Sequence, residues 1–419
     1  MKKFGLKIIY WILAAEARKV INIHKPFVIG ITGSAGKSST KEAVYQVLHD
    51  RFGDNVRKSH GNFNSEMGLP LAILGYGERK SAPGWLWPVF LIQTYLRTFQ
   101  KKFPKYLVLE LGVDKPGDIA YFGRIIKLDI AIITSVSGAH LANFAMTSDY
   151  QAEKLSILKI IKDGGIVIAN RDDAVLAKID FPKTIFYAVS DRTANFYAEN
   201  IKLTLAGTEY RICGVGQKIA IRSELLGPQF VASALAAFAV GQNFLIQSLQ
   251  IKKSLEKIKP MSGRMRIIAG KKKCILIDDT YNASPVSVKA ALDVLSEIKY
   301  TGRKVAILGN MNELGQFEAE EHRLIGEYSR NKADLIVFVG KNAHLMAKAN
   351  GQVENILTFD NRQELIKPLN TIIKSDDLIL IKASQNNNFF EEVTKQLLKN
   401  PAEASELLVR QSKKWMKKK

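Results

Sequence analysis

A short glycine-rich turn constrains this chain more than any other stretch. The apolar run FVIGIT (27–32) leads into Gly33-Ser34-Ala35-Gly36-Lys37-Ser38-Ser39-Thr40, and a helical pattern over Ser38–Leu48 follows. Glycines let backbone N–H groups face an anion, a helix N-terminus adds the positive end of its dipole, and a Lys-Ser pair supplies a cation and a hydroxyl that can hold Mg²⁺. This order of strand, loop and helix predicts a phosphate-binding site on an α/β sheet.

The loop has the short form G-x-x-G-K-S, because Ile31 stands where the longer form has its first glycine. Lys37 is expected to neutralise charge on the β- and γ-phosphates of a nucleotide, and Ser38 to ligate Mg²⁺. The predicted nucleotide-binding loop consists of Gly33, Ser34, Ala35, Gly36, Lys37, Ser38 and Ser39. The alternative is a chance glycine turn before an amphipathic helix, which this context disfavours.

The chain has 419 residues, enough for two or three domains, and its 47% hydrophobic and 24% charged residues are typical of globular proteins. Apolar runs alternate with helical stretches in two blocks, which predicts an α/β fold. The first block is a phosphate-loop domain with a mostly parallel sheet and antiparallel strands appended over 184–226, and the second is a Rossmann-like α/β domain. The expected units are a basic amphipathic helix (1–25), a central domain (26–262), a C-terminal domain (263–400) and a basic tail (401–419), with a hinge at Lys259–Gly263.

Individual elements follow from the same patterns. The expected strands are Phe27–Thr32, Tyr106–Leu111, Ile130–Thr134, Ile166–Ala169, Cys274–Ile277, Lys304–Leu308, Leu335–Val339 and Leu378–Ile381. The expected helices include Ser38–Leu48, Asp149–Ile161, Phe230–Val240 and Ile246–Ile258.

Lysine and arginine outnumber aspartate and glutamate by 61 to 40, which gives a formal net charge of +21. Such a charge attracts anionic partners. The excess is spread along the chain without a nucleic-acid recognition motif, so small anionic molecules are expected as partners and nucleic acid is not. Cys213 and Cys274 suit neither a zinc site nor a disulfide framework, and a reducing cytoplasm is therefore expected.

Three segments combine basic residues with apolar or aromatic ones: 1–25, Gly84–Leu96 and the terminal RQSKKWMKKK. The apolar part of the first, Ile8–Ala15, is far shorter than the ~20 residues of a spanning helix, and no signal-peptide cleavage pattern follows it. Either these segments contact an anionic membrane surface, or the first two pack on the protein's own core and the third is a solvated end. We expect a cytoplasmic monomer, with peripheral contact at the inner membrane face as the open alternative.

Further candidate ligands follow two other strands. Glu110 lies near the end of YLVLELG, and His140 follows DIAIITSV. Carboxyl ends of parallel strands face the ligand crevice of an open α/β sheet, so both side chains are candidate Mg²⁺ ligands. The alternative for His140 is a hydrogen-bonded loop residue. Lys154 lies in the helical stretch QAEK, whose pattern alone predicts a solvated surface lysine.

Several short, distinctive segments follow one another along the chain between about Phe27 and Glu392. They are TGSAGKSST, NFNSEMG followed by LPLAIL, LELGVDKPGDI, ITSVSGAHLANF, AEK at 152–154, SGRM at 262–265, IDDTYNASPVSVKAAL, and LGNMNELG followed by HRLIGE. In number and order this set resembles the Mur ligases, ATP-dependent enzymes that form amide bonds in peptidoglycan assembly. Any one segment is a weak signal, whereas the whole set is a specific one.

The resemblance implies roles that the patterns alone do not assign. Lys154 would be carbamylated by CO₂ and would help to hold a second Mg²⁺. The implied metal ligands are Ser38, Glu110, His140 and Lys154, and the implied catalytic residues are Lys37, His140 and Lys154. Further ATP contacts would come from Arg264, Asp279 and Asn282 in a C-terminal domain that closes over the nucleotide. Substrate contacts would come from Asn62, Asn64, Asn312 and Glu313.

The implied reaction uses ATP and Mg²⁺ and acts on nucleotide and peptidoglycan-precursor small molecules. A substrate carboxylate attacks the γ-phosphorus, and the amine of D-Ala-D-Ala or a similar compound attacks the resulting acyl phosphate. One alternative is a ligase of the folylpolyglutamate synthetase type acting on another carboxylate, which the DDTYNASP and NMNELG segments disfavour. Another is a catalytically silent scaffold at the membrane, which the presence of Lys37, Glu110, His140 and Lys154 disfavours.

Three segments depart from the family pattern. About 25 residues precede the first strand, in place of the domain with which related ligases hold a UDP-sugar. The stretch GPQFVASAL (227–235) replaces a segment that carries His and Asn near the adenine, and Lys382-Ala383-Ser384 stands where Lys-Gly-Ser is expected. We therefore expect differences in how the sugar nucleotide and the adenine are held.

Overall fold

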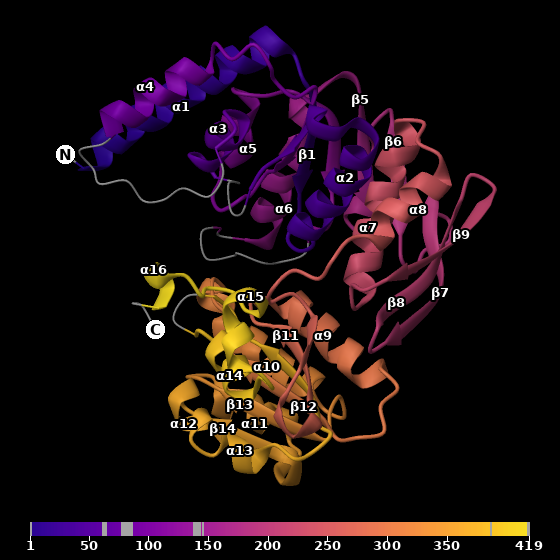
Figure 1. Ribbon diagram of the computed structural model, residues 1–419, viewed down its shortest axis with the longest axis vertical. Coiled ribbons are helices and arrows are strands. Elements are labelled where there is room, and N and C mark those ends of the chain that lie inside the picture. The colour runs from indigo at the N-terminus through magenta and orange to yellow at the C-terminus, as the bar shows by residue number, and fades with distance from the viewer. Residues whose placement is uncertain are drawn as a thin grey trace.

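The computed structural model describes residues 2–60, 65–76, 87–136, 144, 146–385 and 388–416. Within these ranges the chain forms two α/β units, each built on its own sheet (Figure 1). Asn62, Asn64 and His140 lie outside the described residues, as do residues 84–86 and 417–419 of the basic, apolar segments.

Within the described ranges the first sheet has nine strands in the order β2-β3-β1-β4-β5-β6-β7-β8-β9. Strands β2 to β7 run parallel, and β8 and β9 are antiparallel to their neighbours. The strand bounds are β1 (Phe27–Thr32), β2 (Val56–Lys58), β3 (Tyr106–Glu110), β4 (Leu128–Ile133), β5 (Ile161–Asn170), β6 (Thr184–Ala188), β7 (Phe196–Thr204), β8 (Gly207–Gly214) and β9 (Gln217–Ser223).

The direction of β6 corrects the expectation of antiparallel strands from residue 184. β6 pairs in parallel with β5, with Val167 opposite Thr184, and β7 pairs in parallel with β6. The chain returns across the sheet between Asn170 and Thr184, a connection long enough for a parallel crossover. The antiparallel ribbon therefore begins only between β7 and β8.

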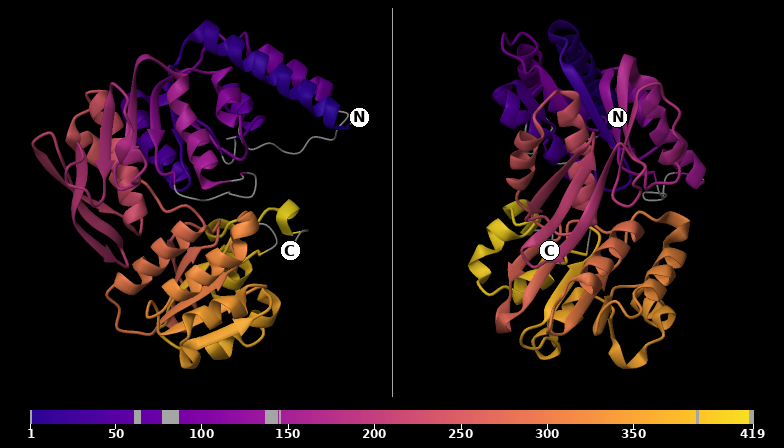
Figure 2. Two further views of the ribbon diagram at one scale, coloured as in Figure 1. Left: turned by 180° about the vertical axis from the view of Figure 1, so that it is seen from behind. Right: turned by 90° about the vertical axis from the view of Figure 1, so that its right-hand side faces the viewer.

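Helices cover both faces of the first sheet, because alternate strand residues point to opposite sides. One face packs against α2 (Lys37–Phe52), α7 (Pro228–Asn243) and α8 (Ser248–Glu256). The other packs against α1 (Lys2–His24), α3 (Gly68–Ile73), α5 (Asp118–Gly123) and the segment that contains α6 (Thr147–Leu155). The remaining helix of this unit, α4 (Trp87–Arg97), lies along α1, as Figure 1 and the left view of Figure 2 show.

Helix α1 is part of the first unit rather than a separate arm. Leu13, Ala17 and Val20 are fully buried in the core, whereas Trp11 on another side of the helix is 73% exposed. The neighbouring α4 also exposes apolar side chains, among them Ile92 and Leu96. One face of the pair thus packs on the core and another faces solvent. No helix in the described part of the chain is sufficiently long and apolar to span a bilayer.

The second sheet has six strands within the described ranges, in the order β10-β11-β15-β12-β13-β14, and all but β10 run parallel. The strand bounds are β10 (Arg266–Ala269), β11 (Ile275–Asp279), β12 (Lys304–Gly309), β13 (Leu335–Val339), β14 (Ile356–Phe359) and β15 (Leu378–Lys382). One face packs against α9 (Pro285–Glu297), α10 (Glu318–Tyr328) and α11 (Ala343–Asn350). The other packs against α12 (Arg362–Ile366), α13 (Leu369–Ile372), α14 (Glu391–Leu397) and α15 (Ala404–Leu407), and α16 (Lys413–Met416) follows.

The connection between the two units ends at Gly263, which is fixed to the second sheet. Its N–H donates to Oδ2 of the buried Asp278 (3.0 Å), and its carbonyl accepts from the N–H of Tyr281 (3.0 Å). Gly263 has φ +68°, and a Cβ there would lie 2.9 Å from the Tyr281 nitrogen, so the position requires glycine. Burial raises the pKa of Asp278 to about 6.

The segment after residue 400 packs further onto the second unit than a solvated tail would. Ala404 and Leu408 are buried, and the Arg410 guanidinium makes two contacts with Glu391, Nη2 to Oε2 (2.9 Å) and Nε to Oε1 (3.2 Å). Arg410 also donates to the carbonyls of Thr280 and Tyr281. This ion pair links the C-terminal segment to the loop after β11.

Replacing Arg410 with alanine should lower the free energy of unfolding by about 3–5 kcal/mol, because Glu391 would remain as an unpaired buried carboxylate. The matched control is Arg323→Ala, which removes exposed ion pairs with Glu320 and Glu327 and should cost less than about 1 kcal/mol. Urea unfolding followed by circular dichroism measures both changes. Equal stability of the two variants would contradict a structural role for the buried pair.

Candidate active site

The phosphate loop rests against the carboxyl end of β4. Gly33 has φ +150°, and a Cβ there would fall 1.9 Å from Oγ1 of Thr134, so no other residue fits without a shift. The N–H groups of Ser34 and Ala35 donate to the Ser135 carbonyl (2.9 Å) and hydroxyl (3.1 Å). Helix α2 then begins at Lys37, where its first N–H groups have no partner within the helix. The loop is thus held in place with a helix N-terminus directed toward an anion.

Lys37 folds back over the loop. Its Nζ donates to the Gly33 carbonyl at 2.6 Å. Burial lowers the pKa of Lys37, although the Glu110 carboxylate offsets part of this effect. The ammonium therefore stands beside the place where phosphate oxygens would approach the helix N-terminus.

Glu110 provides a carboxylate at the end of β3. Its Oε2 accepts from Ser38 Oγ (3.1 Å) and Lys41 Nζ (3.3 Å). Burial raises the pKa of Glu110, but the charges of Lys41 and Lys37 and the Ser38 hydrogen bond outweigh it and hold the pKa below its usual value. An ionised carboxylate beside a hydroxyl is an oxygen donor set that suits Mg²⁺. Sequence reasoning did not select Lys41, although it lies one turn after Lys37 on α2.

The interpretation of Lys154 as a solvated surface lysine is wrong. Lys154 is fully buried, its Nζ donates to the Gly33 carbonyl (3.1 Å), and the same nitrogen lies 4.6 Å from the centre of the Tyr150 ring. Burial, aided by the charge of Lys37, lowers the pKa of Lys154 well below its usual value. The helical pattern does not show that this face of α6 covers the phosphate loop.

The opposite wall comes from the second unit. Arg264 lies over the Tyr281 ring, 4.2 Å from its centre. Asp279 pairs with Lys382 (2.5 Å), and Asn282 Oδ1 accepts from Ser384 Oγ (2.7 Å). The ends of β11 and β15 therefore hold a connected set of polar side chains that faces the phosphate loop.

The substitution of alanine in Lys382-Ala383-Ser384 leaves this arrangement intact. Ala383 is fully buried, and a Cβ at Gly309 would lie only 2.7 Å from its methyl group. The absence of a side chain at Gly309 thus makes room for Ala383, while Lys382 and Ser384 keep their contacts.

Two adjoining cavities lie between the walls. The larger, about 320 Å³, is lined by the loop residues Ser34–Ser38, by Glu110 and Asp114, and by Arg264, Tyr281, Asn282, Glu313 and Gln385 of the second unit. The smaller, about 160 Å³, shares Ser34, Ala35, Gly36, Arg264 and Asn282 with it. Its other lining residues include Ser39, Gln229, Phe230, Asp279 and the apolar Met265, Ala283 and Val286. The charged cavity suits the phosphates of a nucleotide, and the less polar cavity beside it suits the base.

Gln229 belongs to the stretch that departs from the family pattern. It lies at the start of α7 and lines the smaller cavity, where its Oε1 is buried without a hydrogen-bond partner among the described residues. Its Nε2 donates to the Leu226 carbonyl (3.3 Å), which orients the amide. A base in the smaller cavity would therefore lie beside the Gln229 side chain.

The loop after β12 contributes Asn312 and Glu313. Asn312 donates to the Gln385 carbonyl (2.5 Å), and Glu313, with φ +67°, lines the larger cavity. His322 on α10 holds this loop: its Nε2 accepts from the Met311 N–H (2.9 Å), while Nδ1 lies 2.7 Å from the Glu318 carbonyl. Burial lowers the pKa of His322, which suits the neutral ring that these contacts need. No spacing rule in the sequence indicates this positioning role.

The structure thus brings together the loop residues, Glu110, Lys154, Arg264, Asp279, Asn282, Asn312 and Glu313. Sequence reasoning missed Lys41, Asp114, Tyr281 and Gln385, of which the last three lie within or beside recognised segments. No group of three His, Cys, Asp or Glu side chains gathers as a metal site in the described ranges, and His140 lies outside them. Among the expected metal ligands, Ser38 and Glu110 are in mutual contact.

Comparisons with known proteins follow the same division. The Mur ligase middle domain matches residues 90–241, and the Mur ligase glutamate ligase domain matches residues 263–385. The UDP-N-acetylmuramoyl-tripeptide--D-alanyl-D-alanine ligase of Bacillus subtilis is 28% identical over 378 residues, 89% of this chain and 76% of the relative. The enzyme of that name from Escherichia coli is 28% identical over 380 residues, 89% of this chain and 77% of the relative.

Solved structures agree. MurF ligase from Thermotoga maritima, crystallised with ADP, aligns with a TM-score of 0.77 at 25% identity, over 94% of this chain and 84% of that one. MurF from Acinetobacter baumannii aligns with a TM-score of 0.76 at 25% identity, over 91% and 78% of the two chains. Both family domains thus match in order, on the two units that form the walls of the site, and the chain belongs to the Mur ligase family.

Proposed function

We propose that this protein is an ATP-dependent ligase that joins D-alanyl-D-alanine to the carboxylate of UDP-N-acetylmuramoyl-tripeptide in peptidoglycan synthesis. The observation that carries the proposal is the cavity between the units, with Lys37, Ser38 and Glu110 on one wall and Arg264 and Glu313 on the other. The names of the curated relatives and the MurF structures support the choice of substrates.

The nucleotide would lie across both cavities. Its phosphates would lie at the N-terminus of α2 in the larger cavity, between Lys37 and Arg264, and its base in the smaller cavity near Gln229. Ser38 and Glu110 fit a magnesium ion, and bound Mg²⁺ would neutralise charge on the phosphate oxygens. Asp279 and Asn282 would contact the nucleotide from the second unit, where Lys382 and Ser384 hold their side chains in place.

The reaction would proceed by two displacements. The substrate carboxylate attacks the γ-phosphorus and ADP leaves, while Lys37 and Arg264 stabilise the charge that spreads over the transferred oxygens. The amine then attacks the acyl phosphate and expels phosphate, on the side where Asn312 and Glu313 lie. Enclosure between the two walls excludes water that would hydrolyse the acyl phosphate. Asn62, Asn64 and His140 keep their expected roles as proposals.

We also infer that Lys154 is carbamylated. A lysine reacts with CO₂ only as the neutral amine, and the buried setting of Lys154 favours that form. The amine nitrogen bonds to the carbon of CO₂ and loses a proton, so a neutral amine becomes an anion. The carbamate would then place a negative charge beside Lys37, near the Gly33 carbonyl that both lysine side chains contact.

Two other expectations remain proposals. Exposed apolar side chains on α1 and α4 support peripheral contact of a cytoplasmic protein with the inner membrane face, and a monomer is expected.

The domain boundaries are proposed with two changes: residues 2–24 join the central domain, because α1 packs in its core, and residues 401–410 join the C-terminal domain.

Purified protein should release phosphate from ATP and form an amide only when UDP-N-acetylmuramoyl-tripeptide and D-Ala-D-Ala are both present. Mass spectrometry of the product, beside a phosphate-release assay, measures both events. Single-substrate reactions serve as controls. Turnover with a folate and glutamate, without turnover on the muramoyl substrate, would instead support the folylpolyglutamate synthetase type.

Lys37→Ala should reduce ATP-dependent turnover by about 100- to 1,000-fold, because the transferred phosphoryl group loses a positive partner. The fold should persist, since the side chain contacts the Gly33 carbonyl rather than the core. Steady-state kinetics measures the loss, and Lys218→Ala, at an exposed lysine paired with Glu199, is the control. Phosphate release at the rate of the unaltered protein would refute the nucleotide-site assignment.

Lys154→Ala should lose activity that excess bicarbonate does not restore, whereas a short carboxylic acid should restore part of it by occupying the vacated place. The unaltered protein should show a ¹³C carbamate signal with labelled bicarbonate, and the variant should lack it. Lys159→Ala, at an exposed lysine shortly after α6, is the control. A full rate in the Lys154 variant, or no carbamate signal in the unaltered protein, would contradict the inference.

A further inference from the structure

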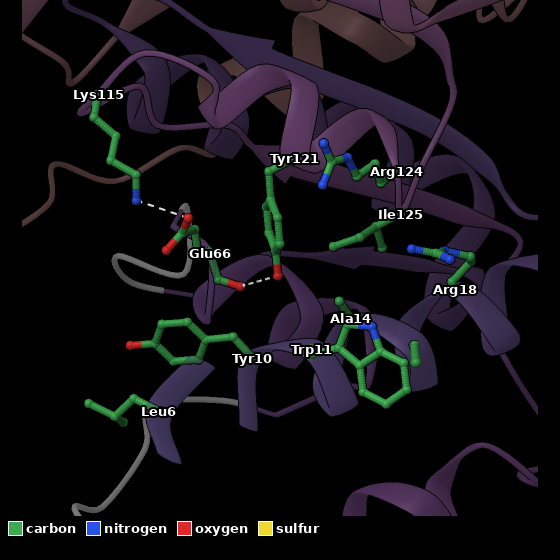
Figure 3. A pocket seen from close by; sticks show the side chains of 11 residues that line it. Leu6, Tyr10, Trp11, Ala14, Arg18, Glu66, Lys115, Tyr121, Arg124 and Ile125 are labelled. Atoms are coloured by element: carbon green, nitrogen blue, oxygen red, sulfur yellow. Dashed lines mark hydrogen bonds and ion pairs between the residues drawn. The ribbon is translucent and has the colours of Figure 1, made fainter. Parts of the chain in front are cut away.

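A third cavity, larger than the two described above, lies on the other side of the loop between β3 and α5. Its volume is about 930 Å³, and Figure 3 shows its side chains. Asp114 of this loop lines the phosphate cavity, whereas its neighbour Lys115 lines the large cavity. The two cavities are therefore separated by one stretch of backbone, and an extended ligand can reach from one to the other.

Aromatic and apolar side chains form much of the large cavity. Tyr10 and Trp11 of α1 face Tyr121 of α5, whose Oη donates to the Glu66 carbonyl at 2.9 Å (Figure 3). This hydrogen bond fixes the tyrosine ring between α1 and α5. Trp11 is 73% exposed, so its ring is open to a ligand. Such a surface suits a planar or apolar group.

Two arginines stand at the end of this cavity away from Lys115. Arg18 comes from α1 and Arg124 from the end of α5, and Figure 3 shows them on the same side of Tyr121. Neither guanidinium has an ion pair or a side-chain hydrogen bond with another residue in the described ranges. In contrast, Arg303 and Arg410 of the same chain are held by carboxylates. Guanidinium groups without a carboxylate partner can bind phosphate oxygens.

The carboxylate of Glu66, which lines this cavity, does not exclude an anionic ligand. Glu66 forms an ion pair with Lys115, Nζ to Oε1 at 2.9 Å. Its charge is thereby balanced, and Arg18 and Arg124 give the far end a positive charge. A ligand with an anionic group next to an aromatic or apolar group matches this distribution.

We propose that this cavity binds the diphosphate end of the acyl substrate, with the diphosphate between Arg18 and Arg124 and the attached group against Trp11 and Tyr10. The assignment rests on the proposed function, which places the reacting carboxylate at the phosphate loop. The sugar and peptide would then cross the β3–α5 loop beside Lys115. Under the proposed function the attached group is the uridine of the acyl substrate, and a polyprenyl chain is the alternative that the test separates from it.

The test measures binding to the full chain by isothermal titration calorimetry, with the ATP site filled by excess ADP and Mg²⁺. The probes are UDP, farnesyl diphosphate and inorganic diphosphate. We expect one of the two organic diphosphates to bind, and Arg18→Ala/Arg124→Ala to weaken that binding by about 100-fold. Tighter binding of UDP indicates a nucleotide-linked substrate, and tighter binding of farnesyl diphosphate a lipid-linked one.

Two variants serve as comparison. Trp11→Ala should weaken binding of the same probe by about tenfold through lost stacking or apolar contact, without loss of the fold because the ring is exposed. Arg211→Ala/Arg222→Ala removes the same charge from the exposed side of β8 and β9 and should leave the affinity unchanged. An equal loss in this control would show a general charge effect and overturn the proposal.

Other outcomes of these measurements also test the assignment of the cavity. No saturable binding of UDP or farnesyl diphosphate, or equal binding by the Arg18/Arg124 variant, overturns the cavity assignment. Inorganic diphosphate binding as tightly as the organic probes would show an adventitious ion only. Amide formation with an unchanged KM for the acyl substrate in that variant overturns the assignment but leaves the ligase proposal standing. Arginine-dependent UDP binding without any amide formation overturns the ligase proposal alone.

Discussion

The carbonyl oxygen of Gly33 accepts hydrogen bonds from the side-chain nitrogens of Lys37 and Lys154, and much of the site is arranged around this convergence. It requires a glycine at residue 33, because any Cβ would collide with Thr134 at the end of β4. It also brings two buried amines together, where burial lowers the pKa of both, and the nearby carboxylate of Glu110 is engaged by Lys41 and Ser38. Lys37 and the N-terminus of α2 are thereby positioned to bind phosphate.

Neither unit alone encloses the reacting groups. The first unit supplies the helix N-terminus and the carboxylate, whereas the second supplies Arg264 and the loop that His322 holds. Each wall is internally braced, by Ser135 beneath the phosphate loop and by Lys382 and Ser384 behind Asp279 and Asn282. Rigid walls that meet across a cavity let one movement both assemble the site and exclude water.

Local patterns predicted the parts of the fold that depend on local physics. The strands β1 and β13 have the predicted bounds, and the phosphate loop follows β1 as its glycines and Lys-Ser pair indicate. The direction of β6 depends on a crossover, which no alternation pattern reveals. The burial of Lys154 depends on which face of α6 covers the loop, and only the family resemblance placed it there. Arg18 and Arg124 are distant in sequence and line the same cavity only because of the tertiary fold.

The attachment of Gly263 to the second sheet determines where the chain can bend. Because its N–H and carbonyl are both held by the β11 region, and Ser262 contacts the Glu406 carbonyl and Arg266, any bend of the connection lies before Ser262. Arg264 follows Gly263 directly and stacks on Tyr281, so it should move together with the second sheet as one rigid unit. The distance between Arg264 and the phosphate loop should therefore increase when the two units move apart and decrease when they close. A pair of spectroscopic labels near these two places would report that opening without any substrate bound.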